Sequence, residues 1–209
     1  MLSSSGMLLT ALIVLWRKGV PAYITAYTWQ AWLLAALTAI VGYFGDDSRL
    51  YVVSGVLVLL KGVAIPRLLG EMQRRFGIEP KTRPYVNTEI SLLAAGLLVL
   101  FAYVIARPLM AVTELPTREG LPLAMALLFV SLFIIVSRRK AITQVIGFLM
   151  LENAIALVAV VGTYGVPLLV EFGVFLDALM GFLVMQIFVY HIHETFDTID
   201  VEQLTRLRH

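Results

Sequence analysis

Seven apolar segments, separated by short stretches that hold charge, proline or glycine, run through this sequence from end to end. Most approach the length of about 20 residues that an α-helix needs to cross a bilayer. Inside lipid a helix satisfies all of its own backbone polar groups. We therefore predict an all-α, polytopic transmembrane helix bundle that forms a single domain over residues 1–209. The expected spans are Leu2–Trp16, Ala22–Phe44, Leu50–Gly70, Thr88–Ala106, Leu121–Val136, Ala141–Gly162 and Pro167–His191.

The composition supports the same conclusion and narrows the chemistry. Sixty per cent of the residues are hydrophobic and 14% are charged, whereas a soluble domain carries about 25% charged residues. The chain has no cysteine, which excludes disulfides, thiolate catalysis and cysteine-ligated metal centres. It shows no nucleophile–base constellation and no glycine loop for phosphate. His191 and His193 lack a third ligand, so we favour a solvated helix end over a metal site. We predict no active site, metal site or cofactor in this chain.

Lysine and arginine strongly favour one side of the predicted bundle. With seven spans, twelve of these residues fall in loops on one side and three in loops on the other. The positive-inside rule places the first group in the cytoplasm. We therefore expect the inner membrane of a prokaryote, with the N-terminus outside and a cytoplasmic tail at 196–209. The basic residues are thereby explained without nucleic acid. Six aromatic residues that cluster toward segment ends are interpreted mainly as interfacial anchors: Tyr23, Tyr27, Trp29, Tyr43, Phe44 and Tyr51.

A few ionisable side chains are expected at bilayer depth. Lys61 lies midway along the third span, Glu152 is equally deep in the sixth, and Asp177 lies near the middle of the seventh. A charge at the bilayer centre costs about 2.5–3.5 kcal/mol on insertion scales, so these groups must face the bundle, pair, or meet water. One interpretation is an ion pair of Lys61 with a carboxylate that only fixes helix packing. The other is a proton or cation relay, because burial raises the pKa of a carboxylate and lowers that of a lysine.

Three further polar residues complete the candidate set. Glu171 lies about one turn inside the outer end of the seventh span, where it is either part of the relay or an interfacial carboxylate. Gln30 and Asn153 are neutral groups that could support the ionisable ones.

Two stretches of the sequence resemble each other and suggest an internal repeat. Aligning Arg17 with Arg139 places Gln30 on Glu152, and a gap of about six residues then sets Lys61 on Asp177. Residues 1–75 and 118–195 would be parallel copies of three helices, joined by the span at 88–106. Repeats in membrane proteins often build a polar path at their interface. Chance similarity between apolar helices is the alternative.

The last third of the chain carries a more specific resemblance. Residues 138–153 contain Gly-Phe-Leu-Met-Leu-Glu-Asn, a Val-Glu-x-Gly segment includes Glu171, and Asp177-Ala178 follows. These motifs resemble component E of the hydrogenase-4 and formate hydrogenlyase type of membrane complex. That family is similar, in its last three helices, to the small K-type subunit of respiratory complex I. The chain departs from the K-type motif Gly-x-Glu-x-x-x-Asn, because Gly147 and Asn153 match but position 149 is leucine. Asp177 stands where the second K-type glutamate is found.

The resemblance implies a non-catalytic membrane subunit of a respiratory, complex I-related complex. Its partners would be antiporter-like membrane subunits, a membrane anchor subunit and a soluble hydrogenase-like module that holds nickel-iron and iron-sulfur centres. This chain would contribute Glu152, Asp177, Lys61 and Glu171 to proton translocation. Two alternatives stay open, a small subunit of a multi-subunit cation/proton antiporter and a purely structural assembly subunit.

Overall fold

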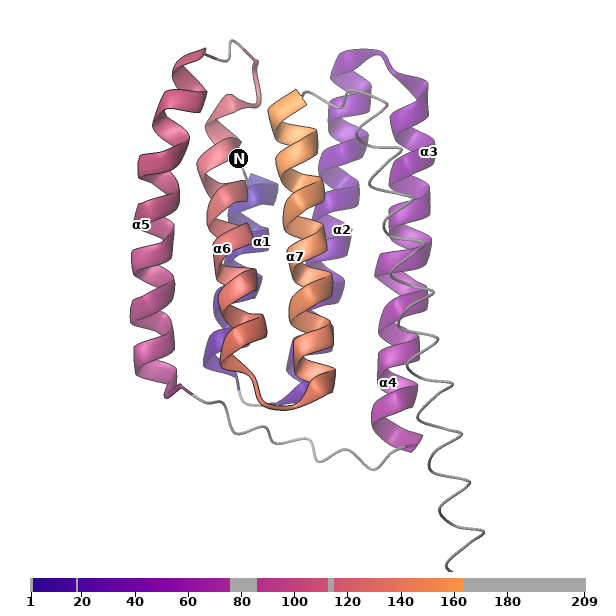
Figure 1. Ribbon diagram of the computed structural model, residues 1–209. Helices are drawn as coiled ribbons and strands as arrows, with labels where there is room; N and C mark the ends of the chain where they lie inside the picture. Colours follow the sequence, from indigo (N-terminus) through magenta and orange to yellow (C-terminus); the bar gives the residue numbers. More distant parts are fainter. Residues whose placement is uncertain (1, 18, 76–85, 113–114, 164–209) are drawn as a thin grey trace, which may run out of the picture. The chain divides into compact units, whose positions relative to one another are not determined.

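The computed structural model describes residues 2–17, 19–75, 86–112 and 115–163, and this part of the chain is built from helices that run alongside one another (Figure 1). Five of its helical stretches are long and apolar enough to cross a membrane, and a shorter apolar helix precedes them. The helices are α1 (Leu2–Trp16), α2 (Val20–Gly45), α3 (Ser48–Leu57), η1 (Val58–Ala64), α4 (Ile65–Arg75), α5 (Thr88–Val112), η2 (Arg118–Gly120), α6 (Leu121–Ser137) and α7 (Ala141–Thr163).

The predicted all-α fold is confirmed, and most of the predicted span boundaries are close to the observed ones. The first segment coincides with α1, and the second, fifth and sixth differ from α2, α6 and α7 by one or two residues. The third is longer than expected, because α3, η1 and α4 form one continuous apolar stretch over Ser48–Arg74. The seventh expected span and the tail at 196–209 lie outside the described residues.

The predicted end of the fourth span at Ala106 is wrong. Helix α5 passes through Pro108 and ends at Val112. Proline removes one backbone donor, but transmembrane helices tolerate this loss where the freed carbonyl finds another partner. Pro108 therefore lies inside the helix and does not end it.

The turn between α2 and α3 shows how the sequence reverses the chain in two residues. Asp46 has φ 51°, the left-handed conformation that ends helices, and its N–H donates to the carbonyl of Gly42. Asp47 then caps α3, because its side chain accepts from the N–H of Arg49 at 3.0 Å. Gly42 is required here, since a Cβ at this position would lie 2.9 Å from Cβ of Leu50.

The core lies among α1, α2, α6 and α7. Helix α6 packs on α7, α1 packs on both α2 and α6, and α2 packs on α7. Gly147 lets α6 and α7 approach closely, because a Cβ there would lie 3.0 Å from Ile134 Cγ2. The two predicted repeat copies thus meet through α1 with α6 and α2 with α7. The repeat and the boundaries at 1–75 and 118–195 stay predictions.

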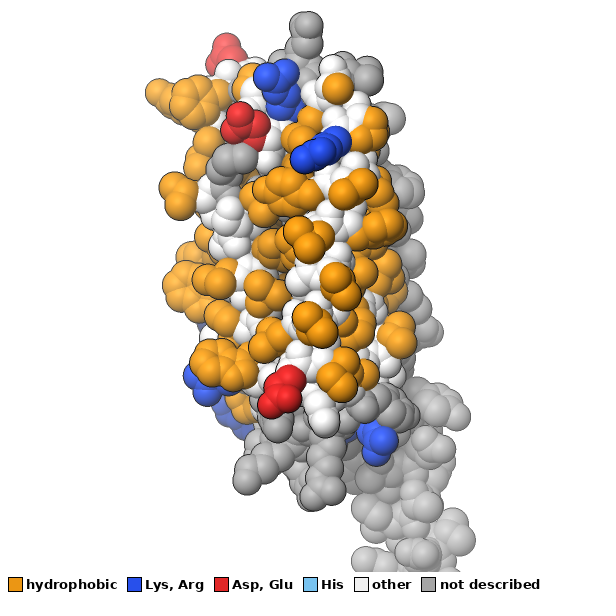
Figure 2. Space-filling model, turned by 90° about the vertical axis from the view of Figure 1, so that its left-hand side faces the viewer, with side chains coloured by type: hydrophobic (Ala, Val, Ile, Leu, Met, Phe, Trp, Pro, Cys, Tyr) orange, Lys and Arg blue, Asp and Glu red, His pale blue; other side chains and the backbone are white. Residues whose placement is uncertain are grey.

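The flanks of the bundle expose apolar side chains. Helix α5 lies beside α6 at one edge of the bundle and α3–α4 beside α2 at the other (Figure 1). On α5, Leu93, Leu97, Leu100 and Val104 are each more than 60% exposed and form one stripe. Figure 2 shows this face as a hydrophobic surface with charged side chains near its two ends. Soluble proteins rarely expose an apolar surface of this extent to water, and the chain is therefore a membrane protein.

Candidate functional site

A π-helical turn, η1, sets the position of Lys61 within the α3–α4 stretch. It ends with the N–H of Ile65 donating to the carbonyl of Leu60, five residues earlier. Such wide turns inside α-helices frequently occur at functional sites. Pro66 has no N–H and cannot donate a hydrogen bond to the carbonyl of Gly62, four residues earlier. This carbonyl accepts a hydrogen bond from Trp32 Nε1 at 3.4 Å. The turn is therefore tied to α2 immediately beside Lys61.

The Lys61 side chain is fully buried and meets two consecutive residues of α7. Its Nζ donates to Asn153 Oδ1 at 3.0 Å and lies 3.7 Å from Glu152 Oε2. The Glu152 side chain is 9% exposed. Lys61 lies midway along the apolar stretch Ser48–Arg74, and Glu152 midway along Ile142–Thr163. The structure thus joins a cation, an anion and an amide at the centre of the bundle.

Pairing Lys61 with Glu152 offsets the free-energy cost that either charge alone would have at the centre of the bilayer. An isolated charge at the centre of a bilayer costs about 2.5–3.5 kcal/mol on insertion scales. Paired, Lys61 and Glu152 sum to zero net charge. Removing one partner of a buried pair leaves the other uncompensated, which typically costs about 3–5 kcal/mol. Unlike Glu152, Asn153 is neutral, so its bond to the lysine N–H does not depend on the charge of the carboxyl.

The other candidate residues are placed differently. Gln30 is fully buried on α2, and its Nε2 donates to the carbonyl of Met7 at 3.1 Å, which joins α2 to α1. Asp177 and Glu171 lie outside the described residues. The predicted alignment of Lys61 with Asp177 is therefore untested.

Sequence reasoning missed Arg138, which it counted as one more loop charge. This residue caps the end of α6 but is 1% exposed. Its Nη2 donates to the carbonyl of Val14 at 3.0 Å and approaches that of Leu15 at 3.4 Å. Its guanidinium carbon lies 5.3 Å from the centre of the Tyr23 ring. Burial lowers the pKa of Arg138 from its ordinary value, and Tyr23 partly opposes this effect.

The interpretation of Tyr23 and Tyr27 as interfacial anchors is wrong. They are 1% and 0% exposed and face the interior of the bundle. The last carbonyls of a helix lack intrahelical donors, and Arg138 supplies one to α1. Because this contact joins residues more than 120 positions apart, no local pattern could have found it.

Replacing Arg138 with glutamine should destabilise the bundle by about 1.5–3 kcal/mol, the range for hydrogen bonds to charged groups. Arg139→Gln is the matched control, because Arg139 is the next residue, is exposed and carries the same charge. Thermal unfolding in mild detergent measures both variants. Equal melting temperatures for the two would contradict the role given to Arg138.

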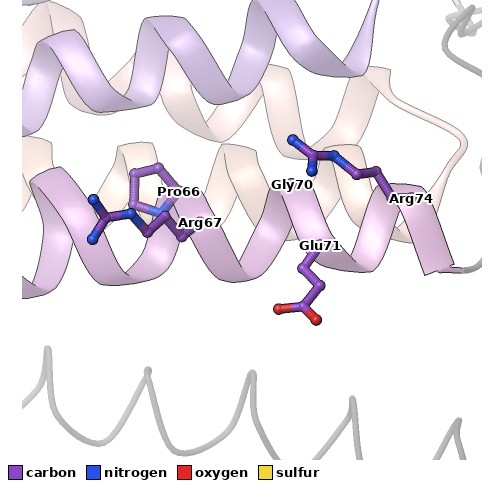
Figure 3. A pocket seen from close by; sticks show the side chains of 5 residues that line it. All are labelled: Pro66, Arg67, Gly70, Glu71 and Arg74. Carbon is purple, nitrogen blue, oxygen red and sulfur yellow. The ribbon is translucent and has the colours of Figure 1, made fainter.

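Polar surface features elsewhere do not form a comparable site. A hollow of about 640 Å³ lies against α4 and is lined by Pro66, Arg67, Gly70, Glu71 and Arg74. Figure 3 shows that Arg67, Glu71 and Arg74 project from different sides of the helix. Among the described residues no three His, Asp or Glu side chains gather as metal ligands. The Lys61 pair is therefore the candidate site.

Comparison with known proteins supplies the family. No family model matches the sequence, and no solved structure matches it. The chain is 32% identical to the uncharacterized protein Rv0085 of Mycobacterium tuberculosis, over 99% of this chain and 94% of that protein. It is 27% identical to hydrogenase-4 component E of Escherichia coli K12, over 97% of this chain and 94% of that protein, and equally so to component E of Shigella flexneri. The chain belongs to the same family as Rv0085 and is homologous to hydrogenase-4 component E, as its motifs predicted.

Proposed function

We propose that this chain is a non-catalytic membrane subunit of a hydrogenase complex and that Lys61 and Glu152 form part of its proton path. The observation that carries the proposal is the contact between a lysine and a glutamate at the midpoints of two membrane-spanning helices. Ionisable residues at this depth are rare and commonly mark ion or proton pathways. Homology to a hydrogenase component supplies the context.

The pair moves charge by electrostatic coupling. When Glu152 takes up a proton, Lys61 loses its counter-charge, and its ammonium becomes costly in the low-dielectric interior. Lys61 then releases its proton onward, and the two groups reset when the Glu152 proton passes to the neutral Lys61 amine, so that one proton enters and one leaves in each cycle. Asn153 keeps the amine in place through this cycle, because a neutral lysine still has N–H groups to donate. Asp177 and Glu171 are proposed as further steps on the same path.

The partners follow from the proposed membership. Antiporter-like subunits and a membrane anchor subunit would contact this chain in the inner membrane. A soluble hydrogenase-like module would hold the nickel-iron and iron-sulfur centres, for which this chain offers no cysteine ligand. The orientation that fits the basic residues places the N-terminus outside and the C-terminus in the cytoplasm.

Glu152→Gln should lower redox-linked proton translocation several-fold while the complex still assembles, because glutamine keeps the shape of the side chain but takes no part in proton exchange. Proton uptake into inverted membrane vesicles measures this, normalised to the amount of assembled complex. Glu89→Gln is the control, since Glu89 is an exposed carboxylate at the start of α5. If Glu152→Gln pumps as the control does, the pair is a structural lock between helices and the proposal is wrong.

A further inference from the structure

Buried polar atoms are distributed unevenly along the bundle. Helices α1 and α6 finish, and α2 and α7 begin, at one end of the bundle, which we call the Arg138 end. Several buried side-chain atoms have no hydrogen-bond partner among the described residues, and they lie at the middle of the bundle or between the middle and this end. They are Gln30 Oε1, Ser131 Oγ, Arg138 Nε and Asn153 Nδ2, with Thr88 Oγ1 at the start of α5.

In the opposite half, three of the described hydroxyls bond to backbone carbonyls. Thr38 Oγ1 donates to the carbonyl of Leu34 at 2.9 Å, and Ser54 Oγ donates to that of Ala35 at 2.8 Å. Thr117 Oγ1 donates to the carbonyl of Val161 at 2.6 Å. These hydroxyls bond to backbone carbonyls and require nothing else.

One face of α2 connects the Arg138 end with the buried pair. Tyr23, Tyr27 and Gln30 follow each other at helical spacing and are each 1% exposed or less. Tyr23 lies beneath Arg138. Gln30 lies about 10 Å further along the helix, at a rise of 1.5 Å per residue. Gln30 lies as many residues from the start of α2 as Glu152 lies from Ile142 on α7. Because α2 packs against α7, the two residues are at a similar depth in the bundle.

Polar atoms buried without partners cost about 1–3 kcal/mol each, and proteins commonly satisfy such atoms with buried water that makes about three hydrogen bonds. We propose that water molecules bound by Gln30, Ser131 and Asn153 form a hydrated route that reaches Glu152 from the Arg138 end only. Among the described residues, the opposite half offers no buried side-chain atom without a hydrogen-bond partner to hold such water. This deepens the proposed function and rests on it for its purpose, because it names the side from which the pair exchanges protons.

The absence of cysteine in this chain makes the route testable. Ser131→Cys and Thr38→Cys each exchange a fully buried hydroxyl for a thiol, in the two opposite halves. Both variants are made in the full chain and studied in native membrane vesicles of both orientations. Silver ions, which reach thiols through water-sized passages, are applied from one side. After denaturation, N-ethylmaleimide labels the thiols that silver has not occupied on this chain.

The Ser131→Cys thiol should react at least about tenfold faster from the Arg138 side than from the other side, since thiol reactivity requires an ionised, hydrated sulfur. The Thr38→Cys thiol should react slowly from both sides. Equal rates for the two variants, or faster reaction of Ser131→Cys from the opposite side, would overturn the route. Gln30→Cys is a second reporter on α2 and should follow Ser131→Cys if that variant does not insert.

The labelling needs no turnover, so the two proposals fail separately. Slow labelling at position 131 together with impaired pumping by Glu152→Gln would remove the route and keep the proton path. Fast one-sided labelling together with normal pumping by Glu152→Gln would keep the route and remove the path.

Discussion

Replacing Lys61 with methionine should destabilise the bundle by about 3 kcal/mol, because Glu152 is then left at the bilayer centre without its counter-charge. Replacing Glu152 with methionine in the same chain should restore most of this loss. Methionine has a similar volume to both side chains, and buried pairs exchanged for apolar residues are often neutral or stabilising. The double variant should therefore be more stable than Lys61→Met alone.

The measurement is a double-mutant cycle of unfolding free energies in mixed detergent micelles. Arg67→Met serves as the control, because Arg67 is an exposed cation on α4 of the same apolar stretch. A Lys61→Met variant as stable as Arg67→Met would show that the contact to Glu152 contributes nothing. Additive effects of the two methionine substitutions would show that the charges do not depend on each other.

The length and hydrophobicity of the segments were sufficient to predict the fold class because lipid restricts the choices. An apolar stretch at bilayer depth has to be helical. The bounds of α1 are therefore those of the apolar segment Leu2–Trp16. Helix α5 continues through Pro108 beyond the expected end at Ala106, because local propensity does not decide where a helix surrounded by lipid ends. Their positions midway along predicted spans likewise identified Lys61 and Glu152 as candidates, since a charge at the bilayer centre costs free energy whichever residues surround it.

The partners of these residues could not be predicted in the same way. Lys61 meets Asn153 across 92 positions of sequence, a contact set by the register between η1 and α7. Gly62 in the π-helical turn also packs closely on α2, because a Cβ there would lie 3.0 Å from Trp32 Nε1. Arg138 looked like its exposed neighbour Arg139, and only the position of α1 distinguishes them.

Lys61→Arg should separate a proton carrier from a fixed charge. Arginine keeps the positive charge opposite Glu152, so the stability of the bundle should stay within about 1 kcal/mol of the wild type. Its guanidinium does not give up a proton in proteins. Proton translocation should therefore fall about tenfold while the redox reaction continues, because the relay needs a group that alternates between two protonation states.

A structural lock makes the opposite prediction for the same variant. An arginine that still pairs with Glu152 would hold the helices together and leave translocation near its normal level. Arg67→Lys is the matched control, since it exchanges the same two residue types at an exposed position of the same apolar stretch.

The ratio of protons translocated to hydrogen turned over, measured in the same inverted vesicles, tests the central claim most directly. A proton path through the buried pair predicts that this ratio, taken per amount of assembled complex, falls sharply in Lys61→Arg and in Glu152→Gln and stays unchanged in Arg67→Lys. A ratio equal to that of the wild type in both variants of the pair would show that Lys61 and Glu152 carry no protons.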